Sequence, residues 1–293
     1  MKQLNIGIFG TSVKPGHIPD YGRLIGWLNE HNITVRFYKP FALLCREQGL
    51  VDSNVPTFSN PNDLAETCNL LISLGGDGTL LNAASFVVGS EIPIVGLNFG
   101  KLGFLAPIDM HFLEDALADL CAGNYDVEHR SMLAIRAKDS DGTHLALNDV
   151  AFKSDTTGLL SMDVFINGQF LNTYFGDGLM VSTPTGSTAY NLSCGGPILL
   201  PENQNFILTP IASHTLTVRP LVIPDTVGIE IRVTDSEQRF HATLDSRRLN
   251  FEGQQTFFIE KAPSQIHTIR FKNQHFFDTL RSKLMWGQHA RVI

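Results

Sequence analysis

The 293-residue chain predicts an α/β domain with a parallel sheet, followed by an all-β, sandwich-like domain. Up to about residue 125, short continuous apolar runs alternate with helical patterns, which is typical of a parallel sheet covered by helices. Beyond that point, apolar and polar residues alternate with a period of two, and turn signals such as Asn167-Gly168 separate the segments. The chain is also longer than one hydrophobic core usually supports.

The first domain is predicted over residues 1–124. Its apolar strands should be buried on both faces, because helices cover both sides of a parallel sheet. Ligands of such sheets bind beyond the carboxyl ends of the strands. In chain order we expect a strand at Leu4–Phe9, a helix at Tyr21–His31, a strand at Ile33–Tyr38, a helix at Phe41–Gln48, strands at Leu70–Leu74 and Ile92–Leu97 with a helix at Leu80–Val88 between them, and a helix at Phe112–Ala122.

The second domain is predicted over residues 125–275 and consists of strands with one exposed face. A final helical segment, residues 276–293, is expected to pack back on the first domain. The alternating strands are predicted at Met132–Ala137, Ile229–Val233, Phe240–Leu244, Thr256–Glu260 and His267–Phe271.

The loop Gly75–Thr79 joins the strand Leu70–Leu74 to the helix Leu80–Val88 and reads Gly-Gly-Asp-Gly-Thr. Glycines permit positive φ angles and let a phosphate approach the backbone amides, and the N-terminus of a helix favours an anion. Asp77 is unusual at an anion site unless it handles a metal or a proton. The loop therefore indicates catalysis, and the alternative is that Asp77 is an ordinary N-cap of the helix.

A second unusual stretch, Asp177–Pro197, is rich in hydroxyl groups and glycine and contains no cationic residue. Its neutral donors and aromatic face suit a ribose, an amide or an adenine better than a bare triphosphate. The plainer alternative is a polar loop followed by a capped helix. We interpret Cys194, within this stretch, as a packing residue. Asn148-Asp149 places an amide and a carboxylate after a strand-like segment, although such pairs are common in turns.

Composition and motif content argue against several other classes. The net charge of −7 is unlike that of a nucleic-acid-binding surface. The four cysteines are scattered without a C-x-x-C pair, which predicts buried thiols in a reducing compartment and neither a zinc site nor a disulfide framework. No signal peptide or membrane span is recognisable, so we expect a soluble, cytoplasmic protein. The sequence has neither a Walker A motif nor a G-x-G-x-x-G fingerprint.

In this order, the loop Gly75–Thr79, the pair Asn148-Asp149 and the stretch Asp177–Pro197 resemble the NAD kinase family. The resemblance spans nearly the whole chain, since it extends to Gly96–Asn98, Leu102–Leu105 and Leu280–Gly287. The Gly-Gly-Asp-Gly-Thr loop is also similar in diacylglycerol kinases, sphingosine kinases and phosphofructokinases. The run Thr-Pro-Thr-Gly-Ser-Thr-Ala-Tyr is far more specific and favours the NAD kinases.

The resemblance implies transfer of the ATP γ-phosphoryl group to the 2′-hydroxyl of the adenosine ribose of NAD, with a divalent cation such as Mg²⁺. It implies that Asp77 accepts the hydroxyl proton. We assign no side chain as a ligand of the metal. The resemblance also implies a homodimer or homotetramer that binds NAD and ATP and neither nucleic acid nor membrane. The residues that it implies in substrate binding are Gly75, Gly76, Asp77, Gly78, Thr79, Asn98, Asn148, Asp149, Asp177, Thr188, Ala189, Tyr190 and Ser193. Arg247 is a further candidate for substrate binding, at a position where the chain departs from the family pattern.

Within this set, the resemblance implies that the Asp149 carboxylate contacts ribose hydroxyls and that Asp177 holds the amide or the ribose on the nicotinamide side. The glycine amides would meet phosphate oxygens. The adenine and ribose pocket would be lined by Thr188, Ala189, Tyr190 and Ser193.

Two positions depart from the family pattern. Many members carry a basic residue two positions before Asp177, where this chain has Phe175, and the usual Asp-Gly-Gln is replaced by Asp245-Ser246-Arg247. Arg247 either supplies positive charge near a phosphate or ends a strand in solvent, and we slightly favour the second. The preference for NAD over NADH is therefore left open. Two alternative functions are a lipid kinase that shares the loop and a catalytically silent NAD(P)-binding regulator.

Overall fold

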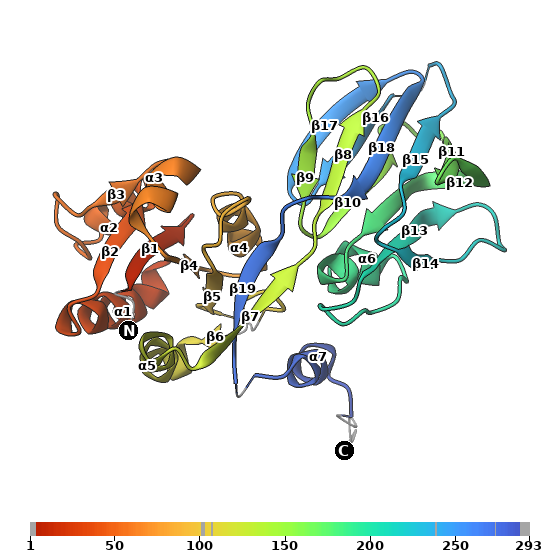
Figure 1. Ribbon diagram of the computed structural model, residues 1–293. Helices are drawn as coiled ribbons and strands as arrows, with labels where there is room; N and C mark the ends of the chain where they lie inside the picture. Colours follow the sequence, from red (N-terminus) through yellow and green to blue (C-terminus); the bar gives the residue numbers. More distant parts are fainter. Residues whose placement is uncertain (1–3, 101–102, 107, 238, 273, 288–293) are drawn as a thin grey trace. The chain divides into compact units, whose positions relative to one another are not determined.

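The computed structural model describes residues 4–100, 103–106, 108–237, 239–272 and 274–287 (Figure 1). The chain divides into two compact units. Unit 1 comprises Met1–His129 together with Ile266–Ile293, and unit 2 comprises Arg130–Gln265. Unit 2 is therefore one continuous segment inserted into the sequence of unit 1.

Unit 1 is built on a mostly parallel sheet, as predicted. The strand order is β3-β2-β1-β4-β5-β19-β7, and β6 pairs with β5. The strands are β1 (Asn5–Gly10), β2 (Thr34–Tyr38), β3 (Thr57–Phe58), β4 (Leu70–Leu74), β5 (Ile94–Asn98), β6 (Ile108–Asp109), β7 (Tyr125–Arg130) and β19 (Ile266–Phe271). The helices are α1 (Ile18–Glu30), α2 (Lys39–Glu47), α3 (Pro61–Thr67), α4 (Asp77–Ala84), α5 (Leu113–Ala122) and α7 (Phe276–Leu284).

The core of unit 1 follows from its continuous apolar strands. Every residue of β4 is buried, as expected for a strand covered on both faces. Phe37 and Phe41 are almost fully buried in the same core. The helix α5 ends at Gly123, whose φ of 73° gives the left-handed C-cap that glycine adopts without strain. None of the helices in the described ranges is long and apolar enough to span a membrane.

The strands β7 and β19 lie in the sheet of unit 1, whereas both fall within residues 125–275, which were expected to form the second domain, and the alternating pattern of His267–Phe271 suggested the same. β19 pairs in parallel with β5, with Thr268 opposite Ile94. An alternating pattern shows that one face of a strand is less buried, and it carries no information about which sheet the strand joins. The expected boundaries after residues 124 and 275 therefore differ from the unit boundaries after His129 and Gln265.

Unit 2 is an antiparallel β domain, as predicted, with an eleven-stranded sheet. The strand order is β17-β16-β10-β12-β11-β15-β18-β8-β9, with β13 paired to β12 and β14 paired to β13. The strands are β8 (Leu133–Ala137), β9 (His144–Ala146), β10 (Asp149–Ser154), β11 (Leu160–Ile166), β12 (Gln169–Ser182), β13 (Asn205–Ser213), β14 (Leu221–Pro224), β15 (Ile229–Val233), β16 (Arg239–Leu244), β17 (Arg247–Glu252) and β18 (Gln255–Lys261). Two short helical segments, η3 (Thr185–Thr188) and α6 (Tyr190–Ser193), follow β12.

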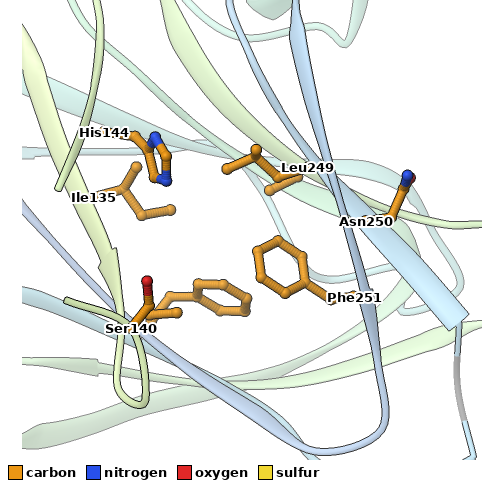
Figure 2. A pocket seen from close by; sticks show the side chains of 9 residues that line it. Ile135, Ser140, His144, Leu249, Asn250 and Phe251 are labelled. Carbon is orange, nitrogen blue, oxygen red and sulfur yellow. The ribbon is translucent and has the colours of Figure 1, made fainter. Parts of the chain in front are cut away.

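The sheet of unit 2 folds over its own core, so strands from its two ends face each other. A cavity of about 200 Å³ lies between these ends. Figure 2 shows Ile135 and His144, from β8 and β9, on one side of the cavity, and Leu249 and Phe251, from β17, on the other. The apolar core continues beyond the cavity between the same strands, which gives the domain its sandwich-like character.

Candidate functional site

Gly75 and Gly76 connect β4 to the eight-residue helix α4, with Gly76 in the N-cap position, and the rest of the predicted loop, Asp77–Thr79, forms the start of the helix. Gly75 has a φ of 150°, and a Cβ there would lie 2.4 Å from Thr79 Oγ1, so glycine is required. A Cβ on Gly76 or Gly78 would meet nothing within 4 Å. The backbone of the loop therefore borders open space next to a helix N-terminus.

The Asp77 carboxylate is held by backbone N–H groups from another part of unit 1. Oδ2 accepts a hydrogen bond from Phe104 at 2.9 Å, and Oδ1 accepts from Leu105 at 2.9 Å and from Ala106 at 3.0 Å. A Cβ on Gly103 would lie 2.0 Å from Asp77 Oδ1, so this approach needs glycine. Asp77 is the first residue of α4 and not its N-cap, which makes that alternative wrong. Oδ2 accepts one of these bonds and keeps a lone pair for a proton.

Asn98 ends β5, the strand beside β4, and is 5% exposed. Its Oδ1 accepts a hydrogen bond from the Gly100 N–H at 3.0 Å. Leu74 pairs with Leu97, and the Gly75 N–H donates to Leu97 O at 2.9 Å. Asn98 and the glycine loop therefore lie at the same edge of the sheet, where the ligands of parallel sheets bind.

In unit 2, Asn148 and Asp149 lie at the start of β10 and are 8% and 6% exposed. The Thr183 N–H donates to Asn148 O at 2.9 Å, and a Cβ on Gly186 would lie 2.1 Å from that oxygen. The pair is thus packed tightly against the hydroxyl-rich stretch. Asn148 Oδ1 is buried and has no hydrogen-bond partner within the described part of the chain. Such an atom costs free energy unless a ligand or water supplies a donor.

Asp149 is surrounded by charges of both signs. Burial and the negative charge of Asp245 raise the pKa of Asp149 to about 7, against the opposing effect of Lys153. Burial also raises the pKa of Asp245, although three backbone N–H groups and Arg247 act in the opposite direction. Carboxyl groups with shifted pKa values gather at functional sites, and the sequence did not identify Asp245 or Lys153 as part of this one.

Part of the hydroxyl-rich stretch forms hydrogen bonds that stabilise the stretch itself. Asn191 is fully buried, and its Nδ2 donates to Ser187 O and to Pro197 O, at 3.1 Å each. Its Oδ1 accepts from Thr209 Oγ1 at 2.6 Å, and a Cβ on Gly196 would lie 1.9 Å from this oxygen. Hydrogen bonds within the protein therefore engage the Asn191 amide and fix the backbone around it.

The other part of the stretch faces outward and contains the predicted ligand contacts. Tyr190 is 37% exposed, Ser193 is exposed, and Thr188 and Ala189 are half-buried. Lys153 Nζ, from β10, lies 4.0 Å from the centre of the Tyr190 ring. The structure thus adds a cation to a stretch that has none in its own sequence, because β10 packs beside a segment that is distant along the chain.

Asp177 and Arg247 occupy exposed positions on two strands of unit 2. Asp177 lies on β12 just before Gly178, where a Cβ would lie 2.0 Å from Phe152 O, so glycine lets β12 approach β10. Arg247 begins β17, and its Nη2 donates a hydrogen bond to Leu145 O. Arg247 therefore lies at the exposed start of β17 and also contacts the segment that precedes Asn148.

Comparison with known proteins identifies the family. The models of the ATP-NAD kinase N-terminal and C-terminal domains match residues 53–125 and 147–271. An NAD kinase of Flavobacterium psychrophilum is 38% identical over 293 residues, which cover 98% of this chain and all of the relative. An NAD kinase of Porphyromonas gingivalis is 38% identical over 287 residues, which cover 98% of this chain and 99% of the relative.

Solved structures show the same fold. A yeast NADH kinase in complex with NADH superposes with a TM-score of 0.85 and 25% identity, covering 99% of this chain and 90% of the yeast chain. An NAD kinase of Archaeoglobus fulgidus in complex with ATP has a TM-score of 0.71 and 24% identity, covers 95% of this chain and 99% of the other, and is similar in fold. With relatives well above 30% identity along its whole length, the chain belongs to the NAD kinase family.

Proposed function

We propose that the protein transfers the γ-phosphoryl group of ATP to the 2′-hydroxyl of the adenosine ribose of NAD, giving NADP. The observation that carries this proposal is the pair Asn148-Asp149, which is almost fully buried and leaves Asn148 Oδ1 without a partner in the described part of the chain. A nucleoside has the amino and hydroxyl donors that this amide oxygen and the neighbouring carboxylate can accept. The names of the relatives, and the NADH and ATP in the two similar structures, support the same substrates.

Unit 1 binds the phosphates of ATP in this proposal. The open backbone at Gly76 and Gly78 lets phosphate oxygens reach amides at the N-terminus of α4, where the helix dipole favours an anion. Gly75 and Thr79 shape the loop, and Asn98 stands beside it at the end of β5. Phosphoryl transfer depends mostly on positioning and on neutralising charge, and a loop between a strand and a helix supplies fixed donors.

Asp77 accepts the proton of the 2′-hydroxyl. A ribose hydroxyl is a weak nucleophile, and a carboxylate placed to take its proton typically accelerates such a step by about 10²–10⁴-fold. The three N–H groups from Phe104, Leu105 and Ala106 hold the carboxylate in one orientation. The remaining lone pair of Oδ2 is the acceptor.

Unit 2 binds the dinucleotide. Ionised Asp149 accepts hydrogen bonds from ribose hydroxyls, and Asn148 accepts one from an amino group of the substrate. The exposed ring of Tyr190 offers a face for the adenine, and Asp177 binds on the nicotinamide side. The other residues that line the adenine and ribose pocket are Thr188, Ala189 and Ser193.

A divalent cation, Mg²⁺ in this proposal, would neutralise the negative charge of the ATP phosphates. Among the described residues, no three His, Cys, Asp or Glu side chains form a group that could hold a metal ion. Mg²⁺ often keeps several waters and binds mainly through substrate phosphates. The donor set therefore fits a cation that arrives with ATP, and we assign no resident metal ligand.

We also propose a homodimer or homotetramer that forms through unit 2. Several large apolar side chains of β12 and of the loop after β13 are exposed, namely Phe170 (54%), Phe175 (44%) and Leu216 (87%). Exposed apolar side chains of this size are typical of protein–protein interfaces when they gather on one surface. Light scattering coupled to size-exclusion chromatography tests the assembly, and a monomer at micromolar concentration would contradict it.

We place the protein in the cytoplasm. The four cysteines, Cys45, Cys68, Cys121 and Cys194, are all free thiols. Free thiols are usual in a compartment where glutathione and thioredoxin keep cysteines reduced.

The decisive assay combines the purified protein with ATP, Mg²⁺ and NAD and detects NADP with an NADP-specific dehydrogenase. A parallel reaction replaces NAD with diacylglycerol and measures phosphorylated lipid. We expect NADP in the first reaction and no product in the second. Phosphorylated lipid without NADP would favour the lipid kinase, and NAD binding with neither product would favour the silent regulator.

A further inference from the structure

We propose that Asp245 is a positioning residue for the dinucleotide, because its carboxylate fixes the segment Leu147–Asp149 and, through that segment, orients the carboxylate of Asp149. This inference rests on the proposed function. Asp245 does not touch the substrate in this account. It acts on Asp149 through the backbone and through its charge. From the sequence, Asp245 was noted only as the first residue of the segment that departs from the family's Asp-Gly-Gln.

Asp245 accepts hydrogen bonds from three consecutive backbone N–H groups. Oδ2 accepts from Leu147 at 2.9 Å, and Oδ1 accepts from Asn148 at 2.7 Å and from Asp149 at 3.3 Å. In the opposite direction, the Asp245 N–H donates to Asp149 O at 3.1 Å. These bonds join residues 96 to 98 positions apart in the sequence, so they fasten the start of β10 to the end of β16.

Asp245 occupies a tight turn between β16 and β17. Leu244 pairs with Arg247, so Asp245 and Ser246 form a two-residue hairpin turn. The φ of 52° at Asp245 is the left-handed conformation that such turns favour and that Asp tolerates better than most residues. Arg247, two residues later, donates to Leu145 O. The turn after β16 therefore holds backbone groups from Leu145 to Asp149.

The charge of Asp245 also contributes, after burial, to the protonation of Asp149. Two charged groups act on Asp149, namely Asp245 from the turn after β16 and Lys153 from β10. Asp149 in turn raises the pKa of Cys194, beside α6. The positive charge of Arg247 acts on Asp245. Burial and the Asp245 charge raise the pKa of Asp149 to about 7. Only the ionised carboxylate accepts hydrogen bonds from two ribose hydroxyls without donating a proton itself. NAD binding should therefore improve as the pH rises through about 7.

The variant Asp245→Asn keeps the shape of the side chain and removes its charge. Its amide nitrogen would face at least one of the three N–H donors, so at least one hydrogen bond to the segment Leu147–Asp149 would be lost. We expect the KM for NAD to rise about 10-fold, the loss of roughly one hydrogen bond to a charged group, with the KM for ATP unchanged. We also expect the pH midpoint of kcat/KM for NAD to fall by about one unit, because the like charge near Asp149 is gone.

A residue with a merely structural role would lower activity at every pH and leave this midpoint in place. The matched control is Asp141→Asn, which removes the same charge from an exposed position in the loop before β9 and should change neither KM nor the midpoint. Calorimetric binding of NAD without ATP separates the two proposals. If the wild-type protein binds NAD but makes no NADP, the proposed reaction fails while the role of Asp245 in binding is still measured.

If Asp245→Asn does not fold, Asp245→Ser tests the same coupling. Carbon-13 NMR of the carboxyl groups follows the titration of Asp149 directly, and the pKa of Asp149 should be lower in this variant because the like charge of Asp245 is gone. An unchanged KM for NAD and pH midpoint in Asp245→Asn would overturn the proposal. An unchanged pKa of Asp149 in Asp245→Ser would do the same.

Discussion

At the scale of single residues, the carboxylates of the candidate site differ in what surrounds them. Asp77 is hydrogen-bonded to three backbone N–H groups that keep it in one orientation. Asp149 is 6% exposed and lies near the negative charge of Asp245. Asp177 is exposed on a strand. Environments of this kind let one side-chain type perform different tasks, so each carboxylate gives a different expectation when its charge is removed.

Replacing Asp77 with Asn should abolish most turnover while NAD still binds. Asn cannot accept the hydroxyl proton, so we expect kcat to fall by about 10²-fold or more. Steady-state kinetics and calorimetric NAD binding measure the two effects, and Asp115→Asn, at an exposed position in the first turn of α5, is the control. If kcat changes less than about 3-fold while the control is normal, Asp77 positions the Phe104–Ala106 segment and the proton leaves by another route.

Asp149→Asn should change how stability depends on pH. The pKa of Asp149 rises from 3.8 to about 7 on folding, so between these values the folded chain keeps a proton that the unfolded chain has released. Stability therefore falls as the pH rises through this range, and the cost of the buried charge is fully present above about pH 7. Asn carries no charge, so we expect Asp149→Asn to be more stable than wild type by about 4 kcal/mol at about pH 8 and similar near pH 4.

Urea unfolding at both pH values measures this difference, with Asp141→Asn as the variant that should follow the wild type. Equal stability of Asp149→Asn and wild type at about pH 8 would show that the native site does not disfavour the charged form. The same substitution should weaken NAD binding, so a gain in stability with a loss of binding would mark Asp149 as a residue kept for its function.

At the scale of elements, apolar periodicity predicted most strands and helices of unit 1, whereas in unit 2 the alternating pattern predicted only β8, β15, β16 and β18. The strands Leu70–Leu74 and Ile229–Val233 have the bounds that the sequence indicated. The helix α4 begins at Asp77, before the predicted start at Leu80, because the glycine and polar residues of its first turn carry no apolar pattern. The two-residue strand β3 and the short helix α3 were not predicted, since so few residues give no detectable period.

One contact between elements carries a prediction about stability. Asp225 follows β14 and its side chain is 1% exposed, with Lys261 Nζ, at the end of β18, 2.6 Å from Oδ2. Lys261→Met leaves a buried carboxylate without its cation, which typically costs about 3 kcal/mol or more. Arg281→Met breaks the exposed pair with Asp278 on α7 and should cost less than about 1 kcal/mol.

Chemical denaturation of the two variants measures this contrast. Asp225→Asn combined with Lys261→Met should recover most of the lost stability, because no unpaired charge is then buried. Equal, small losses in Lys261→Met and Arg281→Met would contradict the prediction and would indicate that water reaches the Asp225 carboxylate.

At the scale of the whole molecule, short motifs predicted the site residues that lie within one loop. Contacts between residues that are far apart in the sequence were not predicted. Asn148 and Asp149 are adjacent and were predicted as site residues, whereas Asp245, which accepts hydrogen bonds from both, lies 96 to 97 positions later in the sequence. Lys153 meets Tyr190 in the same way, across β10 and α6. Such contacts depend on sheet order, and nothing in the sequence of a single strand encodes its neighbours.

Sheet order also explains why the boundaries of the two units could not be predicted from the sequence. The chain leaves unit 1 after β7 and returns to it at β19. The end of β7 and the start of β19 lie side by side, as the distance of 4.7 Å between the ring centres of His129 and His267 shows. Ile269 and Phe271, from β19, belong to the core of unit 1. Unit 1 thus needs a strand from each side of the insertion, and a short connection could replace unit 2.

We therefore expect residues 1–129, joined to residues 266–293 by a short Gly/Ser linker, to fold without unit 2. Closing a short flexible loop between neighbouring strand ends costs little entropy, and the complete core of unit 1 is retained. Residues 1–129 alone should not fold cooperatively, because β19 lies between β5 and β7 in the sheet and its absence exposes apolar core. Near-ultraviolet circular dichroism with thermal unfolding distinguishes the two chains. Identical cooperative transitions in both would show that β19 is dispensable, and no transition in the linked chain would show that unit 1 depends on unit 2 for its stability.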